Sequence, residues 1–325
     1  MRVPEKLTHL RGEETFDPKV HLELTEPERV WSLADFGYGE KFIAKAHFPL
    51  AVTAPFRILS DRGVAALRQS VAALSDARAS DRMAKFMRGT VYRSHFIRDL
   101  CNSPEVTEFI GKLAGAPVLS HPMPLYQGHI NLKPEEEGRD VDRWHTDTVV
   151  LDYVLLLTDR EAFEGGHFEY LQCTKQQAIR HLIREEEEPH LVQVDFPKAG
   201  YAVLQQGNLV VHRGASVTKG DERTTLVQSF VPDTPNYADI SKLVDCKLVD
   251  DPDVLYTEWA RYKAFLAQRR LTQFIEEVPF SDDTGMLCQS LRRAIRDIEE
   301  AVLELSDSSE GRLVHYGQDA LTDHL

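Results

Sequence analysis

The chain has few cysteines and no long hydrophobic run. Its four cysteines are Cys101, Cys173, Cys246 and Cys288, and their wide spacing shows neither a metal-ligand pattern nor a disulfide framework. No apolar segment contains the roughly 20 residues that a membrane-spanning helix needs. From these absences we expect reduced thiols, a cytoplasmic location and no membrane partner.

Positive charge is also scarce relative to negative charge. The 325 residues include 38 Lys plus Arg against 52 Asp plus Glu, which gives a formal net charge of −14. Such a surface repels phosphate backbones, so we expect no nucleic-acid partner. Residues 1–9 are charged and lack an apolar core, so we expect no signal peptide.

What the chain does contain is a series of short segments with strand character between residues 120 and 232. Alternating or β-rich composition predicts strands at residues 126–132, 149–157, 166–172, 191–196, 201–204, 209–212 and 224–231. Seven or more short strands separated by turn residues indicate a sandwich or a barrel.

Helical patterns flank this region. Ser60 and Ser103 offer N-caps to helices that end near residues 74 and 115, and two longer amphipathic patterns cover 255–274 and 284–305. A further helix, residues 174–184, interrupts the strands and leads into the acidic run 185–188. This insert is interpreted as a solvated face or, alternatively, as a lid. The polar chain after Ser306 is expected to be loose.

Three residues have the pattern of metal ligands. His145 and Asp147 lie two apart directly before the predicted strand 149–157, and His212 follows an apolar segment. Alternate side chains of an extended strand point the same way, so His145 and Asp147 can reach one ion. Two imidazoles and one carboxylate hold Fe(II) on one face and leave three coordination positions open. The sequence predicts that these three residues bind iron.

A carboxylate-binding pair follows the triad. Arg223 and Thr225 share one face of the predicted strand 224–231, and a guanidinium beside a hydroxyl is suited to hold a buried carboxylate. An ordinary salt bridge of Arg223 to Asp221 or Glu222 is the alternative. An iron triad with such a pair indicates an oxygenase that consumes a keto acid.

In this order the motifs resemble the Fe(II)/2-oxoglutarate-dependent oxygenases, in particular the prolyl-hydroxylase and phytanoyl-CoA-hydroxylase branches. The resemblance covers roughly residues 120–232 and is carried by the segments 145–147, 163–170, 198–204, 212–220 and 223–227. It implies a mainly β core with flanking helices (α+β), in the form of a double-stranded β-helix or jelly roll. The expected division is an oxygenase domain, 1–235, and a C-terminal helical extension, 236–325, packed on the core or forming a homodimer contact.

The resemblance also implies the chemistry. Fe(II) would be held by the triad, 2-oxoglutarate by Arg223 and Thr225, with O2 as co-substrate and ascorbate as a reductant. No catalytic residue is expected beyond the iron centre. Related halogenases have a small residue where Asp147 stands, so hydroxylation of a C–H bond is favoured over halogenation. Desaturation and ring closure stay open.

The substrate is less well defined by the sequence. Gln127, His129 and Asn131 alternate along a predicted strand and Trp144 adjoins the first ligand, so these four are predicted to line the pocket. Candidates for holding an anionic substrate are Arg93, Arg98, Arg143 and Arg213. A compact acidic chain favours a small molecule, and the resemblance extends to members acting on free amino acids in specialised metabolism. A protein or peptide hydroxylase and a non-catalytic metal-binding β-helix module are the alternatives.

Overall fold

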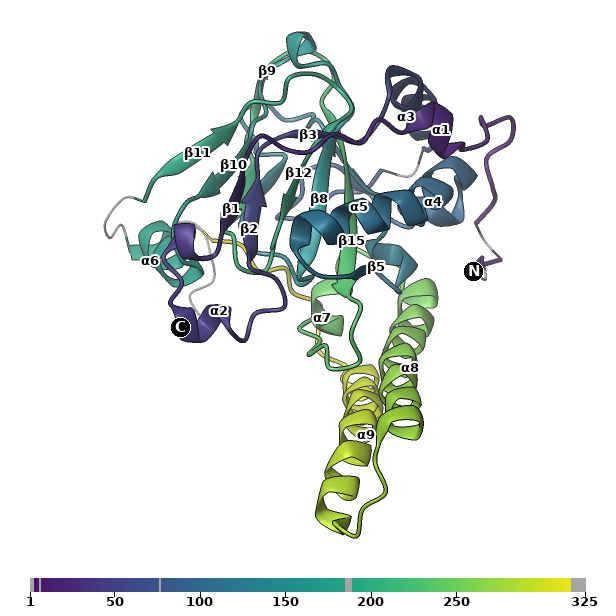
Figure 1. Cartoon of the computed structure of the whole chain (residues 1–325). Helices are drawn as coiled ribbons and strands as arrows, with labels where there is room; N and C mark the ends of the chain where they lie inside the picture. Colours follow the sequence, from purple (N-terminus) through teal and green to yellow (C-terminus); the bar gives the residue numbers. More distant parts are fainter. Residues whose placement is uncertain (1–2, 6, 76, 185–188, 317–325) are drawn as a thin grey trace.

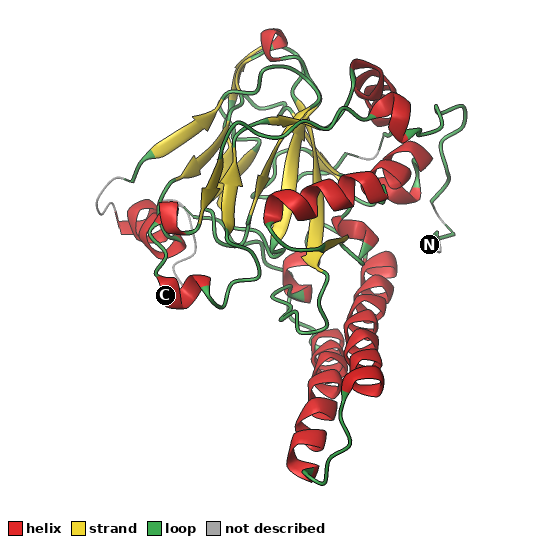
Figure 2. Ribbon diagram, in the orientation of Figure 1, coloured by secondary structure: helices red, strands yellow, loops and turns green. Residues whose placement is uncertain are grey.

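The computed structural model describes residues 3–5, 7–75, 77–184 and 189–316. Antiparallel sheets flanked by helices form the body, and a pair of long helices, α8 and α9, projects from it as a stalk (Figure 1). Figure 2 shows that the strands are confined to the body. Within the described residues, no helix combines the length and apolar character needed to cross a membrane.

The larger sheet has the strand order β1-β2-β12-β8-β15-β6-β4, with β3 paired to β12 and β5 paired to β15. Its strands are β1 (Val30–Ser32), β2 (Leu50–Thr53), β3 (Phe56–Arg57), β4 (Phe86–Met87), β5 (Val118–Ser120), β6 (His129–Leu132), β8 (Leu151–Leu156), β12 (Tyr201–Gln205) and β15 (Thr224–Pro232). The central strand β8 is buried on both faces. Both of its faces therefore pack against other layers.

The smaller sheet has the order β11-β10-β13-β7, and β14 pairs with β9 separately. These strands are β7 (Asp142–His145), β9 (Glu164–Gly165), β10 (Phe168–Leu171), β11 (Leu191–Val194), β13 (His212–Gly214) and β14 (Val217–Lys219). One apolar cluster joins Val154 of β8 and Val203 of β12 to Phe168 and Tyr170 of β10, so the two sheets pack face to face. The expected antiparallel β core with flanking helices is confirmed, while its jelly-roll form stays a prediction.

Helices cover the other face of the larger sheet. Leu151, Tyr153 and Leu155 of β8 belong to a cluster that includes Leu67 of α3 and Ile110 of α5. The helices and 3-10 turns are α1 (Pro18–His21), η1 (Ala34–Phe36), α2 (Glu40–Ile43), α3 (Asp61–Ala73), η2 (Thr90–Tyr92), α4 (His95–Cys101), α5 (Pro104–Ala114), η3 (Pro124–Tyr126), η4 (Arg160–Ala162), α6 (Lys175–Arg184), α7 (Leu243–Cys246), α8 (Pro252–Glu277) and α9 (Thr284–Ser306).

The predicted helix starts are present. Ser60 Oγ accepts a hydrogen bond from Gly63 N at 3.0 Å, and Ser103 Oγ accepts one from Val106 N at 3.4 Å. These side chains satisfy backbone donors that the first turn of a helix leaves without partners. The acidic run 185–188 lies outside the described residues.

The stalk joins the body through the first half of α8. Trp259, Tyr262 and Leu266 of this helix belong to the core cluster that also includes the larger sheet. Trp259 Nε1 also donates to a carboxylate oxygen of Glu304 on α9, at 2.9 Å. Along its length α9 exposes Leu291, Ile295, Ile298, Val302 and Leu303. The expected homodimer contact through these helices stays a prediction.

After α9 the chain returns to the body. Arg312 N donates to the Val244 carbonyl oxygen at 3.0 Å, and Tyr316 N donates to the Trp144 carbonyl oxygen at 2.6 Å. The expectation that the chain after Ser306 is loose is therefore wrong for residues 312–316. Their anchors are long-range contacts, which a polar sequence does not reveal. Residues 317–325 lie outside the described residues.

Candidate metal centre and its cavity

The three predicted ligands, His145, Asp147 and His212, meet in one cavity. His145 ends β7 and pairs with His212 at the start of β13, and Asp147 follows β7 by two residues. His145 Nε2 lies 3.4 Å from Asp147 Oδ1, and His212 Nε2 lies 3.3 Å from Asp147 Oδ2. Ligands in adjacent positions around one ion, at bond lengths of about 2.1 Å, are separated by about 3 Å. The spacing therefore fits three ligands on one face of an ion.

Backbone carbonyl groups orient the two imidazoles. His145 Nδ1 lies 2.6 Å from the Arg143 carbonyl oxygen, and His212 Nδ1 lies 2.9 Å from the Val210 carbonyl oxygen. A carbonyl oxygen only accepts, so each Nδ1 carries the proton and each Nε2 presents a lone pair. Burial, reinforced by the adjacent His145, lowers the pKa of His212 to about 4. This ring is therefore neutral at neutral pH, as metal ligation requires.

Asp147 is only partly buried, and its surroundings favour the charged form. Burial favours the neutral form, but His212, His145 and Arg82 outweigh it and hold the pKa of Asp147 below its ordinary value. Asp152, beside it, shifts the other way, because burial and then the charge of Asp147 raise the pKa of Asp152 well above its ordinary value. Both effects favour the neutral form of Asp152.

The loop between β12 and β13 closes against the ligand carboxylate. Asp147 N donates to the Gly207 carbonyl oxygen at 2.9 Å, and a Cβ atom at Gly207 would collide with Asp147 Oδ2 and Asp152 Oδ2. Gln205 Nε2 lies 3.1 Å from Asp152 Oδ1 and 3.0 Å from His212 Nε2. Sequence reasoning missed these residues. A buried Asp within a strand, a strand-end Gln and a turn Gly carry no site signal before the loop is folded.

Arg223 is a buried cation with 2% of its surface exposed, and it lines the same cavity. Its Nε donates to the Gly166 carbonyl oxygen at 3.0 Å and an NH2 nitrogen of the guanidinium donates to Thr225 Oγ1 at 3.2 Å. Among the described residues, no carboxylate lies within ion-pair distance of Arg223, so the predicted alternative of a salt bridge to Asp221 or Glu222 is not found. Burial lowers the pKa of Arg223 to about 10, which leaves it charged at neutral pH. A buried, unpaired guanidinium is a site for an anion.

The cavity has a volume of about 470 Å³ and is lined by the triad together with Arg223 and Thr225. This is within the usual range of small-molecule sites. His129 and Asn131 also line it, and His129 Nε2 lies 2.8 Å from Asn131 Oδ1. Burial and the nearby Arg88 lower the pKa of His129 to about 3, so this ring is neutral.

Gln127, which was predicted to line the pocket, lies elsewhere. It lines a second cavity, where its Nε2 donates to the His121 carbonyl oxygen at 2.7 Å. Gly128 has a φ of +60°, a left-handed conformation, and β6 begins only at His129. The expected alternation from 127 to 129 is therefore broken, and the prediction for Gln127 is corrected.

Trp144 is also absent from the lining of the cavity. As the neighbour of His145 on β7, it points to the other side of the strand. There its ring lies 4.8 Å from the guanidinium carbon of Arg213, and it packs near Ile179 and Leu182 of α6. Trp144 thus fixes the outer side of β7, and its predicted pocket role is corrected.

Of the four arginines proposed for an anionic substrate, only Arg213 lines the cavity. Its Nε lies 2.7 Å from a Glu169 carboxylate oxygen, and a second guanidinium nitrogen lies 3.2 Å from Asp140. Arg143 contacts His315 at 3.2 Å, and Arg98 pairs with the adjacent Asp99 and faces the second cavity. The arginines that were expected to bind an anion thus either contact other side chains or lie outside this cavity.

The segment after α9 forms one wall of the cavity. Leu313, Val314 and Tyr316 line it, and Tyr316 Oη lies 3.3 Å from Thr146 Oγ1, between the two ligands of the 145–147 motif. We call residues 312–316 the C-terminal wall. Sequence reasoning missed it because no motif marks a segment that comes so long after the triad.

No protein-family model matches the chain, and a search of curated proteins finds no relative. Solved structures of 2-oxoglutarate/Fe(II) enzymes match part of it. The α-ketoglutarate-dependent carbocyclase SnoK of nogalamycin biosynthesis is 17% identical over 63% of this chain and 87% of its own, with a TM-score of 0.41. The epimerase SnoN of the same biosynthesis is 17% identical over 54% of this chain and 75% of its own, with a TM-score of 0.39.

A third similar structure is HygX from Streptomyces hygroscopicus with nickel and 2-oxoglutarate bound. It is 13% identical over 61% of this chain and 87% of its own, with a TM-score of 0.40. The likeness is partial, so the function is inferred below from the cavity itself.

Proposed function

We propose that the protein is a non-haem Fe(II)- and 2-oxoglutarate-dependent oxygenase that oxidises a C–H bond of a small molecule. The observation that carries this proposal is a single cavity that holds both the triad and the unpaired guanidinium of Arg223. A structural metal site has no need of a buried cation beside it, and structural zinc favours four protein ligands. The pairing therefore argues against the non-catalytic alternative.

The residues that line the cavity would have separate roles in binding the metal and the cosubstrate. His145, Asp147 and His212 bind the iron through two neutral imidazoles and one carboxylate, leaving one face open. Arg223 and Thr225 bind the distal carboxylate of 2-oxoglutarate, which supplies the missing negative charge at this end of the cavity. Bound iron with 2-oxoglutarate and O2 supplies the oxidising chemistry, with succinate and CO2 as products.

The outcome at the substrate is proposed to be hydroxylation. Asp147 occupies the third ligand position, where the related halogenases have a small residue. The cavity of about 470 Å³ must hold both the keto acid and the substrate. This volume favours a small molecule over a folded protein, although a peptide side chain would also fit. Desaturation and ring closure depend on how the substrate is placed.

The test is an anaerobic titration of the protein with Fe(II) and then 2-oxoglutarate, following the weak visible charge-transfer band of the chelate. We expect the band in the parent protein and its loss in Asp147→Ala. A parent protein that binds Fe(II) but gives no band and no succinate with 2-oxoglutarate would refute the proposal. Succinate release with a panel of small acids would then identify substrates.

A further inference from the structure

The cations that line the cavity differ in whether they are neutralised. Arg82 lies 3.0 Å from Asp142, Arg88 lies 2.7 Å from Asp250, and Arg213 is paired as described. Lys175 also lines the cavity, yet no ion pair within the described part of the chain includes it. Its Nζ donates to the carbonyl oxygen of Asn208 at 3.1 Å. Lys175 is thus a partly buried cation that, like Arg223, faces the cavity without an ion-pair partner among the described residues.

Lys175 is held in place by the start of α6. Thr174 caps this helix, because its Oγ1 accepts from Gln177 N at 3.4 Å and its backbone N donates to Gln177 Oε1 at 3.1 Å. The backbone N of Lys175 donates to Tyr38 Oη at 2.9 Å, and Tyr38 Oη in turn donates to the Leu209 carbonyl oxygen at 2.9 Å. Lys175 is therefore not a freely moving surface lysine.

The ammonium group lies on the metal side of the cavity. Its partner Asn208 directly follows Gly207, whose carbonyl oxygen accepts from Asp147 N. Arg223, by contrast, is bonded to Gly166 and Thr225 on other strands. Arg223 and Lys175 thus belong to separate parts of the cavity wall.

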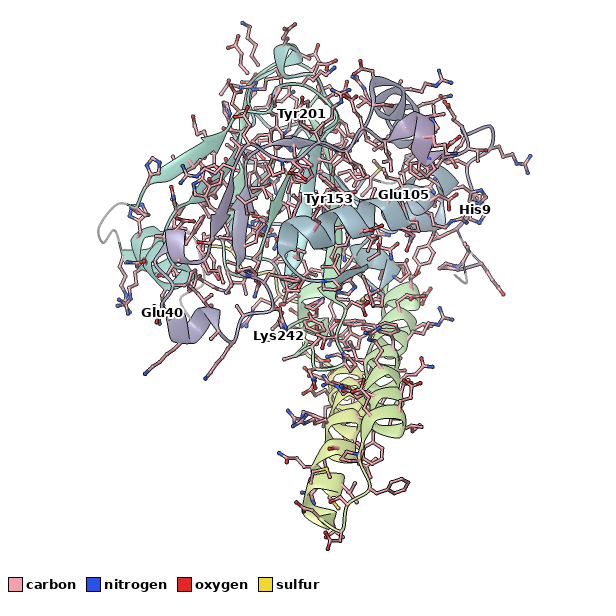
Figure 3. All side chains as sticks on the ribbon, viewed as in Figure 1. His9, Glu40, Glu105, Tyr153, Tyr201 and Lys242 are labelled. Atoms are coloured by element: carbon pink, nitrogen blue, oxygen red, sulfur yellow. The ribbon has the colours of Figure 1, made fainter. Side chains whose placement is uncertain are left out.

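A second positive charge stands near Lys175. Lys242, in the loop between β15 and α7, also lines the cavity and is close enough to Lys175 to disfavour its charged form. Figure 3 shows Lys242 on the underside of the body, beside the start of the stalk. Burial, opposed by Asp147, lowers the pKa of Lys175. An anion bound here would offset both the desolvation of Lys175 and its repulsion from Lys242.

We propose that Lys175, assisted by Lys242, binds a carboxylate group of the substrate and so places the substrate beside the metal. This inference rests on the proposed function, because it takes Arg223 as the residue that binds 2-oxoglutarate. It defines the substrate class as small carboxylic acids. It also assigns the role that was expected of an arginine to a lysine on α6.

The experiment uses the anaerobic protein loaded with Fe(II) and 2-oxoglutarate. Matched pairs of a small acid and its primary amide, such as L-valine with L-valinamide, are added while the visible band is recorded. We expect band shifts with acids and not with their amides. Lys175→Met should weaken acid binding by on the order of 10- to 100-fold, and Lys175→Arg should restore part of it. Lys41→Met is the control, since Lys41 is exposed and outside the cavity.

The outcomes separate this inference from the proposed function. Equal shifts by acids and amides, no shift by any acid, or unchanged acid binding in Lys175→Met would overturn the carboxylate site. A Lys175→Met protein that loses 2-oxoglutarate affinity instead would assign Lys175 to the cosubstrate, which also overturns it. If the parent protein forms no band at all with Fe(II) and 2-oxoglutarate, the proposed function itself fails.

Discussion

The candidate metal centre and the C-terminal wall bound the same cavity but are built in different ways. His145 and His212 lie on paired strands, and a backbone carbonyl group fixes each ring. The wall follows α9, has no regular secondary structure, and is joined to the body by contacts such as Tyr316 N to the Trp144 carbonyl oxygen. A centre held by sheet pairing is rigid, whereas a wall held by a few contacts can vary without disturbing it. We therefore expect changes in the two regions to affect different measurements.

The largest effect is expected at the triad. His145→Ala, Asp147→Ala or His212→Ala should each reduce iron-dependent succinate formation to background, because two ligands do not hold iron in the facial geometry. The exposed His190 offers a matched control as His190→Ala. Near-parental turnover in any of the three triad variants would break the assignment of the metal centre.

The second largest effect is expected at Arg223 and Thr225, the residues proposed to bind 2-oxoglutarate. Arg223→Ala should weaken 2-oxoglutarate binding by about 2–5 kcal/mol, or on the order of 30- to several-thousand-fold, with iron binding nearly unchanged. Thr225→Val should cost only about 0.5–1.5 kcal/mol, since one hydrogen bond is lost. Titration of the charge-transfer band measures both. Parental affinity in Arg223→Ala would mean that the anchor lies elsewhere.

A smaller change tests how tightly the loop holds the metal ligand. Gly207→Ala should lower iron affinity by roughly 10- to 100-fold, because the added Cβ displaces Asp147 and Asp152. Gly39→Ala is the control, since its Cβ would meet no atom within 4 Å. Iron affinity from competition with a coloured chelator gives the comparison. Equal affinities in the two variants would contradict the close approach at Gly207.

The smallest effect on the metal is expected from the wall. Ending the chain after Glu310 should leave the Fe(II) and 2-oxoglutarate band intact but raise the KM for substrate by about tenfold, as apolar contacts worth about 1–2 kcal/mol are lost. Tyr316→Ala should act in the same direction more weakly. Ile295→Ala, on the exposed side of α9, should change neither value. A truncated protein that loses the band would show that the wall also supports the metal centre.

Much of the site could be predicted because its signals are local. The two-residue spacing of His145 and Asp147 and of Arg223 and Thr225 predicted that each pair faces one side, although Asp147 lies just after β7 and Arg223 just before β15. The helices that begin after Ser60 and Ser103 follow from capping. Such features need only a few neighbouring residues, so the sequence states them directly.

Other features depended on contacts between distant segments. Gln127 lies outside the pocket because the backbone turns at Gly128. The charge of Arg213 is neutralised by Glu169 and Asp140. Which cation remains unpaired is decided only when every neighbouring carboxylate is in place, so no pattern distinguished Lys175 from the arginines beforehand.

The sequence by itself therefore determined the predicted ligand set, the predicted carboxylate-binding pair and the β character of the core, since each is a matter of residue type and periodicity. The tertiary structure decided the raised pKa of Asp152, the close approach of Gly207, the absence of an ion pair at Lys175 and the wall at residues 312–316. These depend on burial and on charge neutralisation. Both are properties of the folded arrangement, because they arise between segments that only the fold brings together.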